Sequence, residues 1–163
     1  MEPLFSELWW KVKIEWQEAE AYEQVKNGSS YDFDEKAFLY MITGRFSNRA
    51  PKLFYIGKTY FQVVSWRLGQ EDHRRRYEQL RRDYPKHKLY VNIGLVKILN
   101  GVINPKRVDH IERLLIYAHD FEHKINQKSI YTHGLGEACY EIVNEGHYYP
   151  LHQQIFFGPT FRP

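Results

Sequence analysis

Two short apolar runs that lie close together in the chain most restrict its fold. Residues 37–43 (AFLYMIT) and 53–57 (LFYIG) have the length and the apolar character of strands. Only a polar segment, GRFSNRAPK (44–52), lies between them. Two such runs joined by a short polar loop predict a β-hairpin, with Tyr40 in its first strand and Tyr55 in its second.

Three further segments predict helices, and one predicts a strand. Between residues 4 and 26, apolar side chains recur every three or four positions, which is typical of an amphipathic helix. Residues 63–84 continue with a helical pattern that Pro85 ends. Residues 89–98 alternate as in a half-buried strand. Residues 104–121 begin with Asn-Pro, a favoured start for a helix.

This order of elements predicts an α+β domain. We expect a small, three-stranded, mainly antiparallel sheet flanked by helices, with its core over residues 36–127. Residues 1–35 are expected to form an N-terminal helical extension. Residues 128–163 lack a clear period and are expected to form a C-terminal extension packed on the same domain. A chain of 163 residues has the length of one domain.

Composition limits the functions that this chain can have. Its net charge of +3 permits nucleic acid as a partner without demonstrating one. Aromatic residues make up 17%, and the thirteen Tyr suit half-wet binding faces. The single Cys139 excludes an internal disulfide. No apolar run approaches the roughly twenty residues that a membrane-spanning helix needs, so we expect a soluble cytoplasmic protein with no membrane partner.

Glu112 is the clearest candidate for chemistry. The helix predicted over residues 104–121 has an apolar stripe made of Val108, Ile111, Leu114, Leu115 and Ala118. Glu112 falls at the edge of this stripe, between Val108 and Ile116. A half-buried carboxylate is costly unless a metal, a cation or a hydrogen-bond donor meets it. A rim carboxylate paired with an Arg is the alternative interpretation.

A strongly basic segment follows the hairpin. Residues 73–82 contain five Arg and one Glu, a local positive field that suits a surface along a phosphate backbone. A solvated helix with many salt bridges is the alternative, because acidic residues are interleaved. Before this segment, Gly57 follows the second apolar run and allows close approach of another backbone or a phosphate.

Several of these segments resemble the motifs of one nuclease family. FLYMI (38–42) and LFYIGKT (53–59) resemble the two half-motifs that give the GIY-YIG family its name. Residues 65–67 (SWR) resemble the family's helix arginine, and residues 111–116 (IERLLI) resemble its metal-binding glutamate segment. Residues 125–126 (IN) resemble the asparagine that comes after this segment. The motifs occur in the family's order and span over half of the chain.

The resemblance implies an endonuclease that depends on Mg²⁺ or Mn²⁺ and hydrolyses phosphodiester bonds in DNA, of a restriction, defence or repair type. The catalytic residues would be Tyr40, Tyr55, Lys58, Arg67, His73 and Glu112, with Glu112 as the metal ligand. The residues expected to bind nucleic acid are Gly57, Arg74, Arg75, Arg76, Arg81 and Asn126.

Each implied role has a chemical reason. Magnesium is normally held by one or two carboxylates together with waters and substrate phosphate, so Glu112 alone suffices. Arg67 would hold the scissile phosphate with its planar fork of donors. Tyr40 would orient or deprotonate the attacking water, provided that nearby cations lower its pKa. Asn126 would support the loop of the site.

The position of His73 depends on how the helix over residues 63–84 is built. His73 is six residues after Arg67, about 240° around a regular helix, so the two side chains would not share a face. Gly69 could break the helix and bring them together. Otherwise Tyr77 or Lys58 could fill the second catalytic position.

Other functions remain open at this point. A nucleic-acid-binding module with little or no catalysis would have the same motifs. A protein-interaction domain would use Trp9, Trp10 and Trp16 as anchors, and an N-terminal helix could also form a homodimer. Zinc is a further candidate through His119 and His123, which are four residues apart but have no accompanying Glu or Cys ligands.

Overall fold

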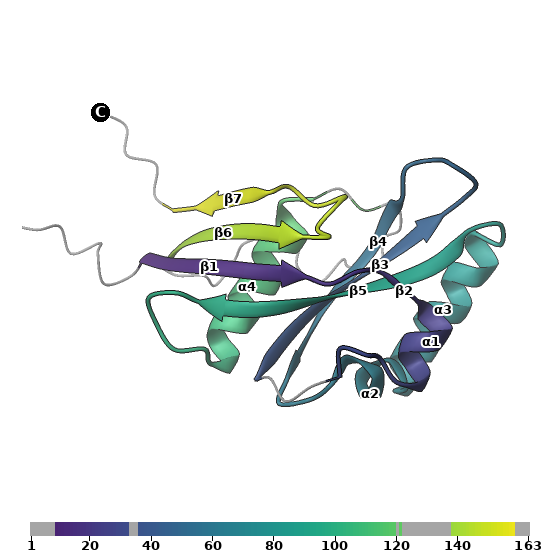
Figure 1. The fold of residues 1–163 in the computed structure, drawn as a ribbon, viewed down its shortest axis with the longest axis horizontal. Helices are drawn as coiled ribbons and strands as arrows, with labels where there is room; N and C mark the ends of the chain where they lie inside the picture. Colours follow the sequence, from purple (N-terminus) through teal and green to yellow (C-terminus); the bar gives the residue numbers. More distant parts are fainter. Residues whose placement is uncertain (1–8, 33–35, 120, 122–137, 159–163) are drawn as a thin grey trace, which may run out of the picture.

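A computed structural model describes residues 9–32, 36–119, 121 and 138–158. Seven strands form one mixed sheet that curls into a half-barrel (Figure 1). The strands are β1 (Trp9–Trp16), β2 (Glu20–Ala21), β3 (Ala37–Arg45), β4 (Lys52–Tyr60), β5 (Lys88–Ile98), β6 (Cys139–Gly146) and β7 (Gln154–Phe157). The helices are α1 (Tyr22–Asn27), α2 (Val64–Leu68), α3 (Glu71–Asp83) and α4 (Pro105–Tyr117).

The sheet has the strand order β4-β3-β5-β1-β6-β7, with β2 paired to β5. β3 pairs antiparallel with β4 and with β5, which confirms the predicted hairpin and the predicted strand over residues 89–98. β1 pairs antiparallel with β5 and parallel with β6. The prediction of a small three-stranded sheet is therefore wrong, because four more strands extend it beyond β5.

The predicted N-terminal helix is also wrong. Residues 9–16 form β1, in which Val12, Ile14 and Trp16 are buried and alternate with more exposed neighbours. A spacing of four residues fits an even alternation as well as a helical turn, so the pattern did not distinguish the two. Trp16 lies in the core and donates its Nε1–H to Asn144 Oδ1 over 2.9 Å. It is therefore not an exposed anchor for a partner, and residues 9–16 do not form the helix on which the predicted dimer contact depended.

The C-terminal segment completes the sheet. Tyr140, Ile142 and Asn144 of β6 are buried and alternate with half-exposed residues. Because one of these inward positions is the polar Asn144, the alternation of apolar residues that predicts a strand is interrupted. The Asn144 side chain accepts the indole N–H of Trp16 and donates to the His152 carbonyl over 2.7 Å.

Two apolar cores lie on the two faces of the sheet. One includes the inward side of α4, and the other includes buried residues of α1, α2 and α3. Figure 1 shows α1, α2 and α3 grouped at one end of the sheet, with α4 apart from them. β4 is the edge strand, and it contacts both groups: Lys58 meets Asp109 of α4, and Tyr55 meets Arg76 of α3.

Of the two later helices that the sequence predicts, one is confirmed at its start and the other is divided. Asn104 caps α4 by accepting the amide of Arg107 over 2.9 Å, and Pro105 is the first helical residue, as expected. The helix predicted over residues 63–84 is two helices, α2 and α3, separated at Gly69 and Gln70. No helix in the described part of the chain is long and apolar enough to cross a membrane.

Candidate active site at the edge strand

Tyr40 and Tyr55 come from neighbouring strands and lie side by side. Their ring centroids are 5.9 Å apart, and both side chains are buried. Gly57 is paired with Tyr40 in the β-ladder, and a Cβ atom at this position would lie 2.4 Å from the Tyr40 hydroxyl oxygen. The close approach that Gly57 permits is thus made by the tyrosine rings of this chain, and Gly57 is buried beneath them.

The break between α2 and α3 brings His73 to Tyr40. The Tyr40 Oη and His73 Nε2 atoms are 2.8 Å apart, and His73 is completely buried. Burial, followed by the positive charges of Arg67 and Arg76, lowers the pKa of His73 to about 3. The imidazole is therefore neutral at physiological pH. Its Nδ1 atom has no hydrogen-bond partner among the described residues.

Arg67 and Arg76 converge on one carboxylate. Both guanidinium nitrogens of Arg67 bind Asp72, each at 3.0 Å, and Arg76 Nη1 lies 3.4 Å from the same carboxylate. The Arg67 hydrogen bond and charge lower the pKa of Asp72 to about 2. Two arginines with one shared carboxylate leave a net positive charge, which suits an anion between them.

Arg76 also contacts the tyrosine pair. Its Nη1 donates to the Tyr55 hydroxyl over 3.1 Å, and its guanidinium carbon lies 4.8 Å from the Tyr55 ring centroid. The sequence placed Arg76 with the nucleic-acid-binding residues, whereas in the structure it joins the tyrosine cluster. Burial raises the pKa of Tyr55, and the charge of Arg76 opposes this shift.

Glu112 is half-buried on α4, and its charge acts on both tyrosines of this cluster. Burial is the main cause that raises its pKa to about 7, and the charge of Asp109 adds to the shift. The cations Lys58, Arg113 and Arg67 act in the opposite direction. The charge of Glu112 in turn contributes to the raised pKa of Tyr40 and of Tyr55. Glu112 is therefore electrostatically coupled to Arg67 and to both tyrosines.

Lys58 and Asp109 form the outer part of the site. Lys58 Nζ contacts Asp109 Oδ1, and Arg113 Nε lies 2.9 Å from Asp109 Oδ2. Asp109 is thus already paired with two cations, and the carboxylate of Glu112 has no ion pair within the described residues. Glu112 is consequently the better placed of the two acids to accept a metal ion.

The side chains at this site suit magnesium better than a metal that needs several protein ligands. The described residues contain no group of three or more His, Cys, Asp and Glu side chains that could hold a metal. One glutamate with open coordination positions is what Mg²⁺ normally uses, together with waters and substrate phosphate. The zinc alternative loses His119, whose ring nitrogens bind the Leu115 carbonyl at 2.6 Å and the His152 amide at 2.8 Å. His123 lies outside the described residues.

The remaining predicted residues are placed apart from the cluster or lie outside the described part. Arg74, Arg75 and Arg81 are exposed on α3; Arg75 pairs with Glu71 at 2.6 Å. Tyr77 stacks on Tyr22, with ring centroids 4.4 Å apart, and so belongs to the packing of α3 on α1. Asn126 lies outside the described residues.

The sequence did not predict a role for Asp72 in the site, and it placed Arg76 among the nucleic-acid-binding residues rather than beside the tyrosines. The spacing of four residues between Asp72 and Arg76 on a helix was a signal for an ion pair. Nothing in the sequence indicates that Arg67, from the preceding helix, shares the same carboxylate.

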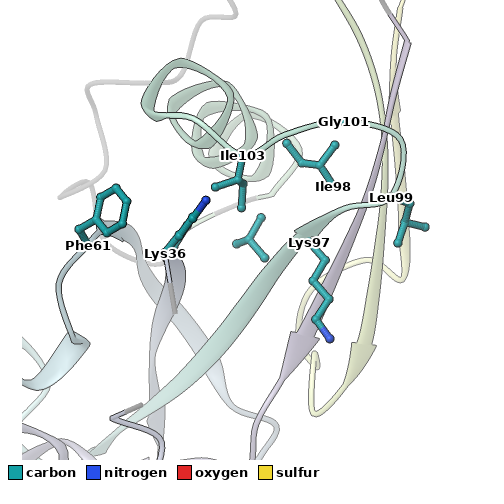
Figure 2. Close-up of a pocket in the computed structure, with 9 residues that line it drawn as sticks. Lys36, Phe61, Lys97, Ile98, Leu99, Gly101 and Ile103 are labelled. Carbon is teal, nitrogen blue, oxygen red and sulfur yellow. The ribbon is translucent and has the colours of Figure 1, made fainter. Parts of the chain in front are cut away.

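A groove of about 740 Å³ lies away from this cluster (Figure 2). It opens between the end of β5 and the segment before α4, and it is lined by Lys36, Ala37, Phe61, Val96, Lys97, Ile98, Leu99, Gly101 and Ile103. None of the tyrosines, arginines or acids of the candidate site lines it. The candidate site therefore does not lie in this groove.

Comparison of the chain with protein-family models, with curated proteins and with solved structures finds no significant match. The function of the chain is therefore inferred from its fold and from the geometry of the site.

Proposed function

We propose that this chain is a metal-dependent endonuclease that hydrolyses phosphodiester bonds in DNA, with a GIY-YIG-type site built into a larger sheet. The observation that carries the proposal is the convergence of Tyr40, Tyr55, Arg67, His73 and Glu112 at one edge strand. These residues are distributed over 73 positions of the chain and five elements, two strands and three helices, so sequence proximity does not account for their meeting.

The two arginines bind the substrate. Arg67 and Arg76 hold the scissile phosphate with fixed N–H donors, and Asp72 sets their orientation. A bound phosphodiester adds negative charge between them. Since their positive charges help to lower the pKa of His73, this anion raises that pKa toward its ordinary value.

Tyr40 and His73 move a proton. Burial raises the pKa of Tyr40 well above 10, so its hydroxyl is neutral and is not a base by itself. When the neutral imidazole has its proton on Nδ1, Nε2 accepts the hydroxyl proton of Tyr40. Because Tyr40 is completely buried, the proton of the attacking water would reach it through the neighbouring Tyr55 hydroxyl, as Tyr40 passes its own proton to His73. Tyr55 is slightly exposed and orients the water from the side of Arg76.

Glu112 would hold the metal, and a Mg²⁺ ion bound there would supply Lewis-acid chemistry toward water and the phosphoryl oxygens. Loss of the proton from Glu112 must precede its binding to a cation, and a pKa of about 7 places that loss near neutral pH. Lys58, whose charge also lowers the pKa of Glu112, would help to stabilise the negative charge that develops in the transition state.

Cleavage and binding of an end-labelled DNA duplex test the proposal. We expect the wild type to cut in Mg²⁺ or Mn²⁺ and not in EDTA. Glu112→Gln should retain binding within about threefold and lose at least a hundredfold in cleavage rate, because only the metal ligand is removed. Glu18→Gln, at an exposed position between β1 and β2, is the matched control and should cut as the wild type does.

The other outcomes decide between the alternatives. Binding without cleavage by the wild type, with every divalent cation tried, would make the chain a nucleic-acid-binding module. Equal cleavage by the wild type and Glu112→Gln would remove Glu112 from the site.

A further inference from the structure

A strongly basic surface in the described part of the chain is made of residues other than those of the candidate active site. It consists of residues 45–52, around the turn between β3 and β4, and of residues 81–88, between α3 and β5. We call it the hairpin surface. Its sixteen residues include seven cations and one acid, Asp83. The cations are Arg45, Arg49, Lys52, Arg81, Arg82, Lys86 and Lys88.

The charge of this surface exceeds that of the whole chain. The two segments carry +6, with His87 neutral, whereas the chain carries +3. The rest of the chain therefore has a net charge of −3, so positive charge is concentrated in these two segments. Such an asymmetry directs polyanions to one face rather than to the whole surface.

The two segments form one continuous surface. Arg45 and Lys88 are paired in the ladder between β3 and β5. The ring centroids of Phe46 and His87 are 5.6 Å apart, and Arg81 Nη1 donates to the His87 carbonyl over 3.1 Å. Figure 1 shows the turn between β3 and β4 at the same end of the sheet as the C-terminal end of α3 and the start of β5.

The two arginines of the turn are supported by aromatic rings. The guanidinium carbon of Arg45 lies 4.6 Å from the Tyr90 ring centroid, and that of Arg49 lies 5.3 Å from the Phe46 centroid. Both arginines are exposed, and neither has an ion pair within the described residues. A guanidinium stacked on a ring keeps its edge N–H groups free to point outward at an anion.

The surface is continuous with the candidate active site through two elements. α3 carries Arg76 at the site and Arg82 six residues later, about 9 Å along the helix. β4 carries Tyr55 at the site and Lys52 about 10 Å away along the strand. Each strand of duplex DNA has one phosphate per about 3.4 Å of helix axis. A strand held at Arg67 and Arg76 would therefore reach the hairpin surface about three phosphates away.

We propose that the hairpin surface binds the phosphate backbone of DNA on one side of the cleaved bond, and so sets the direction in which the substrate crosses the site. This inference rests on the proposed function for the position of the scissile phosphate. Arginines presented on rings and lysines around them contact phosphates without reading bases, so the contribution is independent of sequence.

Binding of a fluorescein-labelled duplex of about 20 base pairs tests this proposal, by anisotropy in EDTA over a series of salt concentrations. The test variant is Arg45→Ala/Arg49→Ala/Lys88→Ala. The control variant is Lys11→Ala/Lys97→Ala/Lys106→Ala, which removes the same charge from other exposed positions. Lys97 is on the same strand as Lys88, about 30 Å further along.

We expect the test variant to bind about 10- to 100-fold more weakly at low salt, and the slope of log affinity against log salt to fall by about 2 to 3. The control should change the slope by less than about 1. Circular dichroism and thermal melting confirm that both variants fold, and Arg49→Glu alone, at an exposed turn position, provides a second variant.

An unchanged slope in the test variant, or equal effects in the two triple variants, would overturn the proposal. So would a test variant that binds DNA normally but loses binding to phosphatidylserine vesicles, because the surface would then face a membrane. Cleavage is measured in parallel with Mg²⁺. If the test variant changes the salt slope but the wild type never cuts DNA, the proposed function is contradicted and the DNA contact at the hairpin surface is not. If the wild type cuts DNA but the test variant leaves the salt slope unchanged, only the DNA contact at the hairpin surface is contradicted.

Discussion

Replacement of Glu112 by Gln is expected to stabilise the fold, in a manner that depends on pH. The pKa of Glu112 is about 7 in the folded chain, against an ordinary value of 4.5. The folded state therefore binds this proton more tightly than the unfolded state, and stability falls as the pH rises from about 4.5 to 7. Above pH 7 the cost is fully present. Gln has nearly the same shape and no charge, so it removes the cost.

The magnitude follows from the pKa difference. At 1.36 kcal/mol for each pKa unit, the difference corresponds to about 3 kcal/mol. The carboxyl is only half-buried and the solvent screens part of this cost, so we expect Glu112→Gln to gain about 1 to 2 kcal/mol at pH of about 8.5. At pH of about 4.5 the gain should nearly vanish, because wild-type Glu112 is then protonated in the folded state.

Urea denaturation of the wild type and Glu112→Gln in EDTA, at both pH values, measures this difference. Added Mg²⁺ should stabilise the wild type at the higher pH and leave Glu112→Gln unchanged, since a ligand that binds only the folded state stabilises it. Glu18→Gln should show neither effect. A gain that is the same at both pH values, or a loss of stability at the higher pH, would refute the reasoning.

Three further predictions concern the same site. The rate of Mg²⁺-dependent cleavage should rise between about pH 6 and 8 with a midpoint near 7, because Glu112 must lose its proton to bind the metal. A pH–rate profile in single turnover measures this, and a flat profile would contradict it. Tyr40→Phe should destabilise the fold by about 1 to 2 kcal/mol in urea denaturation, since it leaves the buried Nε2 of His73 unpaired, and should slow cleavage at least a hundredfold. Gly57→Ala should cost about 1 to 3 kcal/mol, because its Cβ would collide with the Tyr40 ring; an unchanged midpoint of unfolding would show that the tyrosine pair can shift.

The elements that sequence predicted correctly are those whose own residues contain the signal. The two strands of the hairpin and β5 have strand-length apolar patterns, and α4 begins at an Asn-Pro pair that caps it. Each pattern is local and can be read without the partner that the element packs on.

The elements that sequence did not predict depend on partners elsewhere in the chain. β1 is a strand because β5 and β6 are available on its two sides, although a spacing of four residues also fits a helix. β6 has the polar Asn144 at an inward position. The cost of burying its amide is offset by hydrogen bonds to the Trp16 indole and the His152 carbonyl, both of which lie outside β6. Tertiary contacts of this kind override the local pattern.

The site shows the same division. The apolar stripe on α4 pointed to Glu112 as an unusual carboxylate, and the structure places it where burial raises its pKa. The meeting of His73 with Tyr40 required the break at Gly69, which the sequence left as one of several possibilities. The shared role of Asp72 depends on the angle between α2 and α3, and no spacing in the sequence encodes that angle.

Mass spectrometry of reaction products formed in water enriched in oxygen-18 tests the central claim most directly. Wild-type protein, a DNA duplex and Mg²⁺ are incubated together, and the new ends are analysed. The account predicts cut DNA whose new terminal phosphate contains one heavy oxygen atom, because water is the nucleophile, and no product with Glu112→Gln. Intact DNA, or DNA covalently attached to a tyrosine of the protein, would contradict it.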